Sequence, residues 1–299
     1  MVNLTENNAQ DWFNEINAIS VEIDHIDGNA ILESAKVADR HLSDTKRLKE
    51  EIRSGKGFVE LSGLPIDTTL PAPPINGKRP RGKGNVSELC LLGVTHALGL
   101  NPFAYREEKG GALVHEIAPI PDNGKSVSSE GTVSFDFHTD GAYLDRHLRP
   151  HTLSLLCLVD EAGTGTQLAS LRDAVRLLDG EDIDALMSDE FRHTAPETFK
   201  VAEASKRTSV LDRLDGVYEV KAALHNTQGL TPRAKKALDA LRQALVSVTT
   251  TKRWKPGDLV IFSNLRCMHG RGEIRGRRWL QRCYGSHTLP AGAVVQLNR

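Results

Sequence analysis

The sequence predicts a mainly β protein with flanking helices, built as an antiparallel double sheet. Two observations support this fold class: segments with strand character are concentrated in the middle and at the end of the chain, and segments with helical character lie outside them. The 299 residues contain no internal repeat and no change of composition that would mark a linker. Because β-rich chains of this length often form one domain, we expect residues 1–299 to be a single domain.

The first third of the chain predicts two helices with a strand between them. Residues 44–55 and 85–98 are helix candidates, and in the second the apolar residues recur at near-helical spacing before Gly99, which can end a helix. Residues 57–66, GFVELSGLPI, have the pattern of a strand that enters a turn.

A segment rich in proline and glycine lies between this strand and the second helix. Residues 70–84 contain four prolines, three glycines and four basic residues, a composition that resists regular structure. We expect a mobile loop near the surface with solvated charges. Phosphate binding is the alternative, but no aromatic residue interleaves the basic ones as a stacking platform would require.

Strands dominate from residue 132 onward. Residues 132–137, TVSFDF, alternate apolar and polar side chains, as in a half-buried strand, whereas residues 152–159, TLSLLCLV, are almost continuously apolar, as in a buried one. Nearer the C-terminus, a turn at 255–258 precedes a strand at 259–262, and a further strand is expected at 278–286.

Helical character returns after residue 170. The clearest helix begins at Thr231 and Pro232, because threonine suits the N-cap and proline suits the first helical position. We expect this helix to end near Val248.

The bulk composition favours a small-molecule partner. The chain has 38 Lys+Arg and 39 Asp+Glu residues, so its net charge of −1 gives no field that would attract nucleic acid or an anionic membrane. No run approaches the roughly 20 apolar residues that span a bilayer, and the N-terminus lacks the pattern of a signal peptide. Four widely spaced cysteines indicate reduced, buried thiols. We therefore expect a soluble, cytoplasmic protein.

Three residues could form a metal site. His138, Asp140 and His269 provide two imidazoles and one carboxylate, the ligand set of an oxygen-activating ferrous site that leaves coordination positions open. If the strand at 132–137 continues, His138 and Asp140 point to the same face, because residues two apart in a strand do so. A surface or hydrogen-bonded pair is the alternative reading of His-x-Asp. The spacing of His147 and His151 could also suit a metal, but Pro150 argues against the helix that this requires.

Two arginines on the last predicted strand could bind two anions. Arg278 and Arg282 share a strand face and lie about 13 Å apart along it, which suits two different carboxylates. Their apolar neighbours indicate a buried strand, and a buried guanidinium needs an anionic partner. Surface salt bridges are the alternative. The element GTGT at 163–166 could be a simple turn.

Taken together, these motifs resemble the Fe(II)/2-oxoglutarate dioxygenases of the clavaminate synthase and taurine dioxygenase group. The likeness is nearest to the branch of asparagine and arginine hydroxylases. It rests on GKGFVELSGLPIDTTLP at 55–71, EKGGALVHEIAPIP at 108–121, FHTDGAYLDRHLRPHTLSLLCL at 137–158 and CMHGRGEIRGRRWLQRCYGS at 267–286.

The resemblance implies a double-stranded β-helix, or jelly roll, with the metal at one mouth of the sheets. It implies that Fe(II) is bound by the two histidines and the aspartate named above, and that dioxygen and the cosubstrate 2-oxoglutarate are used. The distal carboxylate of 2-oxoglutarate would be held by Arg278 and by Thr166 of the GTGT element. Arg282 would hold the substrate α-carboxylate, and Glu108 and Ser129 would contact the substrate amino end.

The implied activity is hydroxylation of an unactivated carbon of a free L-amino acid or small derivative, with release of succinate and CO2. Desaturation or cyclisation by the same cofactors, a non-catalytic jelly-roll binding protein and a zinc hydrolase are the alternatives. The intact set of three ligands argues against a non-catalytic protein. Substrate polarity stays open, because Glu219 and Lys221 occupy the region where relatives often carry acidic side-chain selectors.

Overall fold

The computed structural model describes residues 2–21, 26–161, 163–196 and 205–297. An eight-stranded sheet forms one half of its centre, with mostly antiparallel neighbours. In spatial order the strands are β1 (Val2–Asn3), β2 (Phe58–Ser62), β14 (Leu259–Ser263), β6 (Thr152–Asp160), β16 (Arg278–Ser286), β3 (Asn101–Tyr105) and β17 (Ala293–Val295), and β4 (His115–Ile117) also pairs with β16.

A four-stranded antiparallel sheet forms the other half. Its order is β13 (Thr249–Lys252), β7 (Thr166–Ser170), β15 (Cys267–Arg271) and β5 (Phe135–His138). The chain thus alternates between the two sheets from β5 to β7 and again from β13 to β16, as in a jelly roll. The predicted mainly β, double-stranded β-helix fold is confirmed.

Side-chain alternation along the strands divides the apolar core into layers. In β6, Leu155 and Cys157 belong to the cluster between the two sheets, whereas Leu156 and Leu158 belong to the cluster on the outer face of the larger sheet. This nearly continuous apolar run is therefore buried on both faces, as the sequence predicted.

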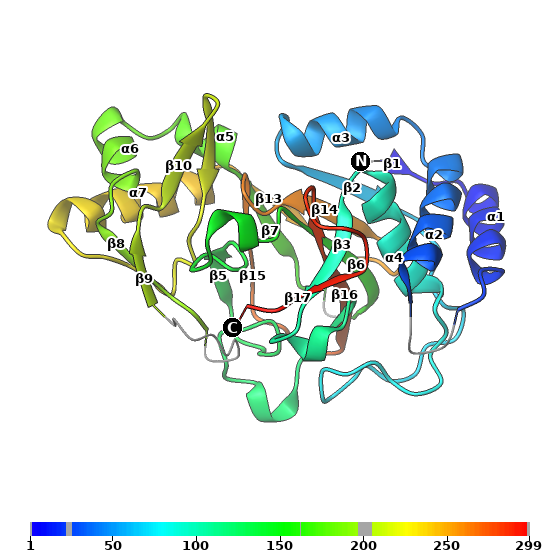
Figure 1. Ribbon diagram of the computed structural model, residues 1–299. Coiled ribbons are helices and arrows are strands. Elements are labelled where there is room, and N and C mark those ends of the chain that lie inside the picture. Colours follow the sequence, from blue (N-terminus) through cyan, green and yellow to red (C-terminus); the bar gives the residue numbers. More distant parts are fainter. Residues whose placement is uncertain (1, 22–25, 162, 197–204, 298–299) are drawn as a thin grey trace.

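Helices cover both outer faces, at opposite sides of the molecule in Figure 1. The outer face of the larger sheet packs on four helices: α1 (Glu6–Asn17), α2 (Gly28–His41), α3 (Thr45–Arg53) and α4 (Val86–Ala97). The smaller sheet packs on α5 (Leu171–Val175), α6 (Gly180–Leu186) and α7 (Pro232–Ser247). Two small sheets lie beside this second group: β12 (Thr227–Gly229), β8 (Phe191–Thr194) and β9 (Ser205–Thr208), and β10 (Leu211–Leu214) with β11 (Val217–Val220).

The predicted helices at 44–55, 85–98 and 231–248 correspond to α3, α4 and α7. At the start of α7, the Thr231 hydroxyl accepts a hydrogen bond of 3.1 Å from the main-chain N–H of Ala234, and Pro232 occupies the first helical position. The predicted N-cap is therefore present. The short strands β8–β12 were not predicted.

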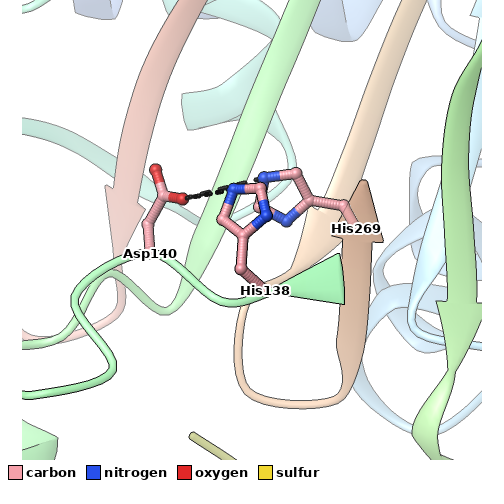
Figure 2. A group of neighbouring side chains, drawn as sticks. All are labelled: His138, Asp140 and His269. Atoms are coloured by element: carbon pink, nitrogen blue, oxygen red, sulfur yellow. Dashed lines mark ion pairs between the residues drawn. The ribbon is translucent and has the colours of Figure 1, made fainter. Parts of the chain in front are cut away.

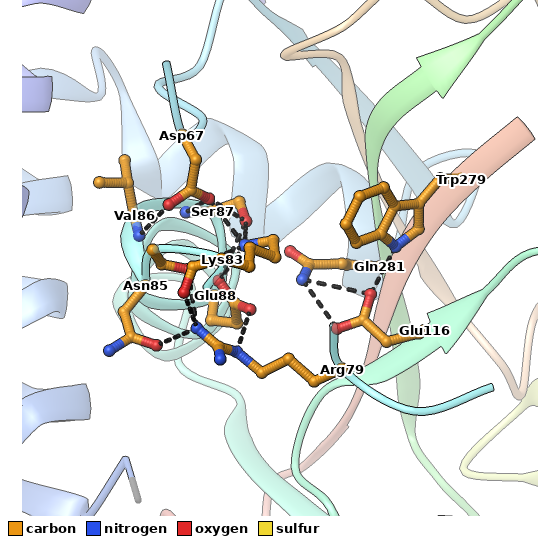
Figure 3. Close-up of polar contacts among 11 residues, drawn as sticks. Asp67, Arg79, Lys83, Asn85, Val86, Ser87, Glu88, Glu116, Trp279 and Gln281 are labelled. Atoms are coloured by element: carbon orange, nitrogen blue, oxygen red, sulfur yellow. Dashed lines mark hydrogen bonds and ion pairs between the residues drawn. The ribbon is translucent and has the colours of Figure 1, made fainter. Parts of the chain in front are cut away.

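The segment 70–84 has no helix or strand, as predicted, but its charges are not all solvated. The Lys83 ammonium is buried and lies 2.7 Å from Asp67 and 2.6 Å from Glu88 (Figure 3). Arg79 donates to Glu88 and to the main-chain carbonyls of Lys83 and Gly84. The prediction of a solvated loop was wrong for these two residues, because buried carboxylates of neighbouring elements supply the counter-charge that a composition argument cannot detect.

The four cysteines, Cys90, Cys157, Cys267 and Cys283, are buried and form no disulfide, as predicted. Burial raises the pKa of each thiol. Within the described residues, no helix combines the length and the apolar character needed to cross a bilayer.

Candidate active site

Two antiparallel strands bring the predicted histidines together. His138 ends β5 and lies directly opposite His269 of β15 in the strand register. The carboxylate Oδ1 of Asp140 is 3.5 Å from Nε2 of His138 and 3.7 Å from Nε2 of His269 (Figure 2). One ligand atom from each residue lies within 4.8 Å of the other two, and among the described residues this is the one group with such an arrangement.

Asp140 reaches this site from a turn and not from a strand. β5 ends at His138, so the prediction that strand alternation aligns Asp140 with His138 was wrong. The side chain of Asn264 holds the Asp140 main chain: its Oδ1 accepts from the Asp140 N–H at 2.8 Å, and its Nδ2 donates to the Asp140 carbonyl at 2.9 Å. Asn264 also donates to the Pro150 carbonyl and is almost fully buried.

The protonation of the three residues fits a divalent metal. Nδ1 of His138 lies 2.9 Å from the Asp136 carbonyl, so it carries the proton and leaves the Nε2 lone pair free. Burial lowers the pKa of both histidines, that of His269 to about 4, which keeps the rings neutral. Burial alone would raise the pKa of Asp140, but the charge of Arg282 and the hydrogen bond from Tyr284 hold it below its usual value. Two neutral nitrogens and one carboxylate match the ferrous ligand set.

Arg278 and Thr166 meet at one wall of the cavity. The Arg278 guanidinium donates to the Thr166 hydroxyl at 3.1 Å, and the indole N–H of Trp254 donates to the same oxygen at 3.0 Å. Arg278 is buried, its Nε has no hydrogen-bond partner among the described residues, and its pKa is lowered by burial against the opposing charge of Asp160. A buried cation with an unused donor in a cavity wall suits an anionic ligand.

Arg282 pairs with Glu108 and Asp140. Its Nη2 donates to Glu108 Oε1 at 2.5 Å and to Nδ1 of His115 at 2.8 Å, and its Nη1 donates to Asp140 Oδ2 at 2.8 Å. The Tyr284 hydroxyl is 2.9 Å from Glu108 Oε2 and 3.1 Å from Asp140 Oδ2. Arg282 and Tyr284 therefore connect Glu108, a candidate substrate contact, to Asp140, a candidate metal ligand.

The outward-facing residues of β16 anchor the strand behind these arginines. Trp279 and Gln281 alternate with the arginines and donate to the buried carboxylate of Glu116 on β4, at 2.5 and 3.1 Å (Figure 3). Glu116 and Gln281 are also register partners in the sheet. The pairing of β4 with β16 thus fixes the strand that carries both arginines.

All eight predicted site residues line one cavity between the two sheets. They are Glu108, Ser129, His138, Asp140, Thr166, His269, Arg278 and Arg282. Ser129 belongs to the connection between β4 and β5, and its neighbours Val127 and Ser128 line the same cavity. The structure therefore brings together residues that are up to 174 positions apart in the chain, as the Arg282–Glu108 bond illustrates.

The region proposed for side-chain selectors does not face the cavity. The Glu219 carboxylate accepts hydrogen bonds from Nε and Nη2 of Arg146, at 2.7 and 2.6 Å, and the Lys221 ammonium donates to the carboxylate of Asp212. The cavity is lined instead by the residues that follow them, Ala223, His225 and Asn226. Because Glu219 and Lys221 are engaged in ion pairs outside the cavity, they are no longer candidates for selecting the substrate side chain.

His151, one of the weaker metal candidates, is used in packing. Its ring stacks on His287, and its Nδ1 accepts the His287 main-chain N–H at 3.0 Å. This agrees with the expectation that the spacing of His147 and His151 is not a ligand pattern.

Sequence reasoning missed several residues of the site. Tyr284 and Arg271 each lie two positions beyond a predicted site residue on the same strand, so strand alternation could have identified them. Asn264, Trp254 and His115 carry no such signal, because their contacts depend on how separate elements pack.

Comparison with known proteins agrees with this geometry. A family model described as taurine catabolism dioxygenase TauD, TfdA family, matches residues 84–284. An L-asparagine oxygenase from Streptomyces coelicolor is 33% identical over 240 residues, which cover 76% of this chain and 70% of that protein. Clavaminate synthase 2 from Streptomyces clavuligerus is 28% identical over 248 residues, covering 78% and 75%.

Solved structures show the same fold. A structure of asparagine oxygenase in complex with Fe(II), (2S,3S)-3-hydroxyasparagine and succinate superposes with a TM-score of 0.85 at 25% identity, covering 100% of this chain and 99% of the other. The non-heme iron oxygenase OrfP, in complex with Fe, succinate and (3S)-hydroxy-L-Arg, superposes with a TM-score of 0.81 at 21% identity, covering 96% and 94%.

Proposed function

Because the chain belongs to the TauD/TfdA family of dioxygenases, we propose that it hydroxylates an unactivated carbon of a free L-α-amino acid or a small derivative that keeps its α-carboxylate. The protein is an Fe(II)- and 2-oxoglutarate-dependent dioxygenase. When bound, iron and 2-oxoglutarate supply the oxidation of a C–H bond by dioxygen, with succinate and CO2 as products. The residues of this chain hold and orient the reactants and keep water out of the cavity.

At the metal end, we assign His138, Asp140 and His269 to Fe(II). Their ligand atoms already converge, and the hydrogen bond from His138 to the Asp136 carbonyl fixes one ring in the tautomer that a metal requires. We assign Arg278 and Thr166 to the distal carboxylate of 2-oxoglutarate. This assignment is supported by the unused donor of Arg278 and by its burial.

The ion pair between Arg282 and Glu108 carries the proposal of an amino-acid substrate. Both side chains line the cavity and are largely buried, with exposed fractions of 9% and 15%. A zwitterionic α-amino acid can replace this one ion pair by two ion pairs. Its carboxylate can pair with the Arg282 guanidinium, and its ammonium can pair with the Glu108 carboxylate. A ligand with one of these groups would leave a desolvated charge without a partner, which is costly.

The rest of the lining favours a neutral, polar substrate side chain. The acids among the described lining residues are Glu108 and Asp140, and both are engaged in the contacts above. Beyond them the wall offers Thr194, His225 and Asn226, and Nδ1 of His225 is buried without a hydrogen-bond partner. A cationic side chain would be desolvated here without a counter-charge among the described lining residues, whereas an amide or hydroxyl could bond to these groups.

The test is anaerobic reconstitution with Fe(II) and 2-oxoglutarate, followed by aerobic assay of an L-amino-acid panel. The panel should contain neutral polar, acidic and basic members, and each should be paired with its deaminated and its N-acetylated analogue. Succinate formation and the product mass are measured together, because a gain of one oxygen indicates hydroxylation and a loss of two hydrogens indicates desaturation or cyclisation.

We expect succinate formation with free neutral polar amino acids, a gain of one oxygen, and little turnover with either analogue. Turnover of a peptide, nucleoside or sulfonate substrate, with none of any free amino acid above the uncoupled background, would overturn the substrate class. The metal and cosubstrate assignments are tested separately by the variants described below.

A further inference from the structure

One wall of the cavity is an irregular loop, residues 121–133, which we call the strap. It begins with the short helix η2 (Pro121–Asn123) and ends before β5, and it places Val127, Ser128 and Ser129 in the cavity lining. It contains no strand, so the sheets do not hold it in place. Other contacts must therefore position this wall.

Arg271 supplies three of those contacts. Its Nη2 donates to the carbonyls of Ser128 and Gly131 at 2.8 and 2.6 Å, and its Nη1 donates to the carbonyl of Val133 at 2.6 Å. A fourth bond, of 3.2 Å, goes to the carbonyl of Gly272. Each of the hydrogen bonds that this buried guanidinium makes to the described residues therefore ends on a main-chain carbonyl, and three of them lie in the strap.

Such a use of arginine needs an explanation. A buried guanidinium ordinarily pairs with a carboxylate, since carbonyl groups compensate its desolvation less well. Here the flat fork of donors reaches three carbonyls at once, a geometry that the compact ammonium of lysine does not reproduce. Arg271 lies two positions after His269 on β15, so the strand that carries a metal ligand also carries the strap's anchor.

Further contacts tie the strap to neighbouring segments and to itself. Glu130 forms an ion pair with Lys109, the residue after Glu108, and its main-chain carbonyl accepts from the N–H of Ile120 at 2.9 Å. Within the strap, Asn123 donates to the Glu130 carboxylate at 2.8 Å. The main-chain N–H of Ile274 donates to the Thr132 carbonyl at 2.8 Å. The strap is thus held by three segments: β15, the connection that follows β15, and the turn that carries Glu108.

We propose that Arg271 is a positioning residue that holds the strap as the substrate-facing wall and so sets the affinity for the amino-acid substrate. The identity of that ligand rests on the proposed function, but the positioning of the strap does not. Removing the guanidinium releases Ser128 and Ser129 from the cavity wall while the two arginines of β16 keep their places.

The experiment compares Arg271→Gln and Arg271→Lys with the wild-type enzyme and with Arg275→Gln. Arg275 is a matched control, because it lies in the connection after β15, is 82% exposed and pairs with the nearby Glu273. Lys125 is an exposed trypsin site within the strap. Four quantities are measured: trypsin cleavage after Lys125, Co(II) affinity under anaerobic conditions, and the KM values for 2-oxoglutarate and for the best amino acid of the panel.

For both Arg271 variants we expect cleavage after Lys125 to accelerate about tenfold or more, since several charged hydrogen bonds are lost. The amino-acid KM should rise about tenfold, while the Co(II) affinity and the 2-oxoglutarate KM stay within about threefold of wild type. The Arg275 variant should match wild type in all four measurements.

Unchanged cleavage after Lys125 would overturn the proposal even if no substrate has been found, because that measurement needs none. A parallel loss of Co(II) and 2-oxoglutarate binding would also overturn it, since Arg271 would then act through β15. If Arg271→Gln does not fold, Arg271→Lys decides between these outcomes, because it keeps the buried charge and removes the fork.

Discussion

The two ends of the cavity are built differently. At the proposed metal and cosubstrate end, His138, His269 and Thr166 stand on paired strands of the smaller sheet, and Arg278 stands on β16 of the larger sheet. At the substrate end, the lining comes mainly from connections: the turn at Glu108, the strap, and residues 223–226. Hydrogen-bonded strands fix side chains to within the precision that a metal needs, whereas connections can change without loss of the fold. In the proposed assignment, one end thus determines the reaction, and the other selects the molecule that undergoes it.

The largest effect should come from removing a metal ligand. His138→Ala, Asp140→Ala and His269→Ala should each abolish turnover and weaken Co(II) binding, with the melting temperature little changed, because each removes a ligand and little core packing. His147→Ala serves as the control, since His147 is exposed and outside the cavity. Full succinate formation by any one of the three variants would remove that residue from the ligand set.

Variants of Asn264 test whether metal affinity depends only on the residues that stand on strands. Asn264→Ala should weaken Co(II) binding by about 10–100-fold, because it frees the turn that presents Asp140. Asn264→Asp keeps the acceptor for the Asp140 N–H but loses the donor, so it should fall between the alanine variant and wild type. A melting temperature that falls without any loss of metal affinity would show that Asn264 serves the fold alone.

The two arginines of β16 should separate the two ends along a single strand. Arg278→Ala should raise the 2-oxoglutarate requirement by about tenfold or more, as expected for a lost charged hydrogen bond. Arg282→Ala should raise the amino-acid KM by a similar factor. Steady-state kinetics with each substrate varied in turn measures both effects. If Arg278→Ala weakens the amino acid alone, the two roles are reversed.

Glu108 should determine selectivity more than rate. Glu108→Gln should reduce the preference for an amino acid over its deaminated analogue by about tenfold, because the analogue no longer leaves a buried carboxylate unpaired. The measurement is the ratio of kcat/KM for the two compounds. Glu107→Gln is a neighbouring comparison outside the cavity lining. An unchanged ratio in the Glu108 variant would assign ammonium recognition to another residue.

The smallest effect is expected at the boundary between the two ends. Tyr284→Phe removes a hydroxyl that lies within hydrogen-bond distance of both Glu108 and Asp140. Since a phenol donates one proton, the loss is about 0.5–1.5 kcal/mol, or a few-fold in kcat/KM. The effect should appear in the amino-acid KM and in Co(II) affinity to similar extents. A change confined to one of them would place Tyr284 at that end alone.

Predictability from the sequence follows the same division. The spacing of Arg278 and Arg282 was enough to place both on one face of a strand, because side-chain alternation is a local property. The same argument failed for Asp140, since no local pattern reveals that β5 ends at His138. A different argument, from composition, failed for Lys83, whose burial depends on carboxylates of other elements.

The sequence by itself indicated the mainly β fold, the strands β2, β5, β6, β14 and β16, the helices α3, α4 and α7, and the chemical types that the reaction needs. Apolar periodicity, capping residues and short motifs reveal these features because they act over a few positions. The tertiary structure decided which of those groups meet. Arg282 bonds to Glu108 across 174 positions, Asn264 holds Asp140 across 124, and Arg271 holds the strap at Ser128 across 143. Such contacts depend on how two sheets pack and how loops close between them, and a packing arrangement of distant segments leaves no periodic trace in the chain.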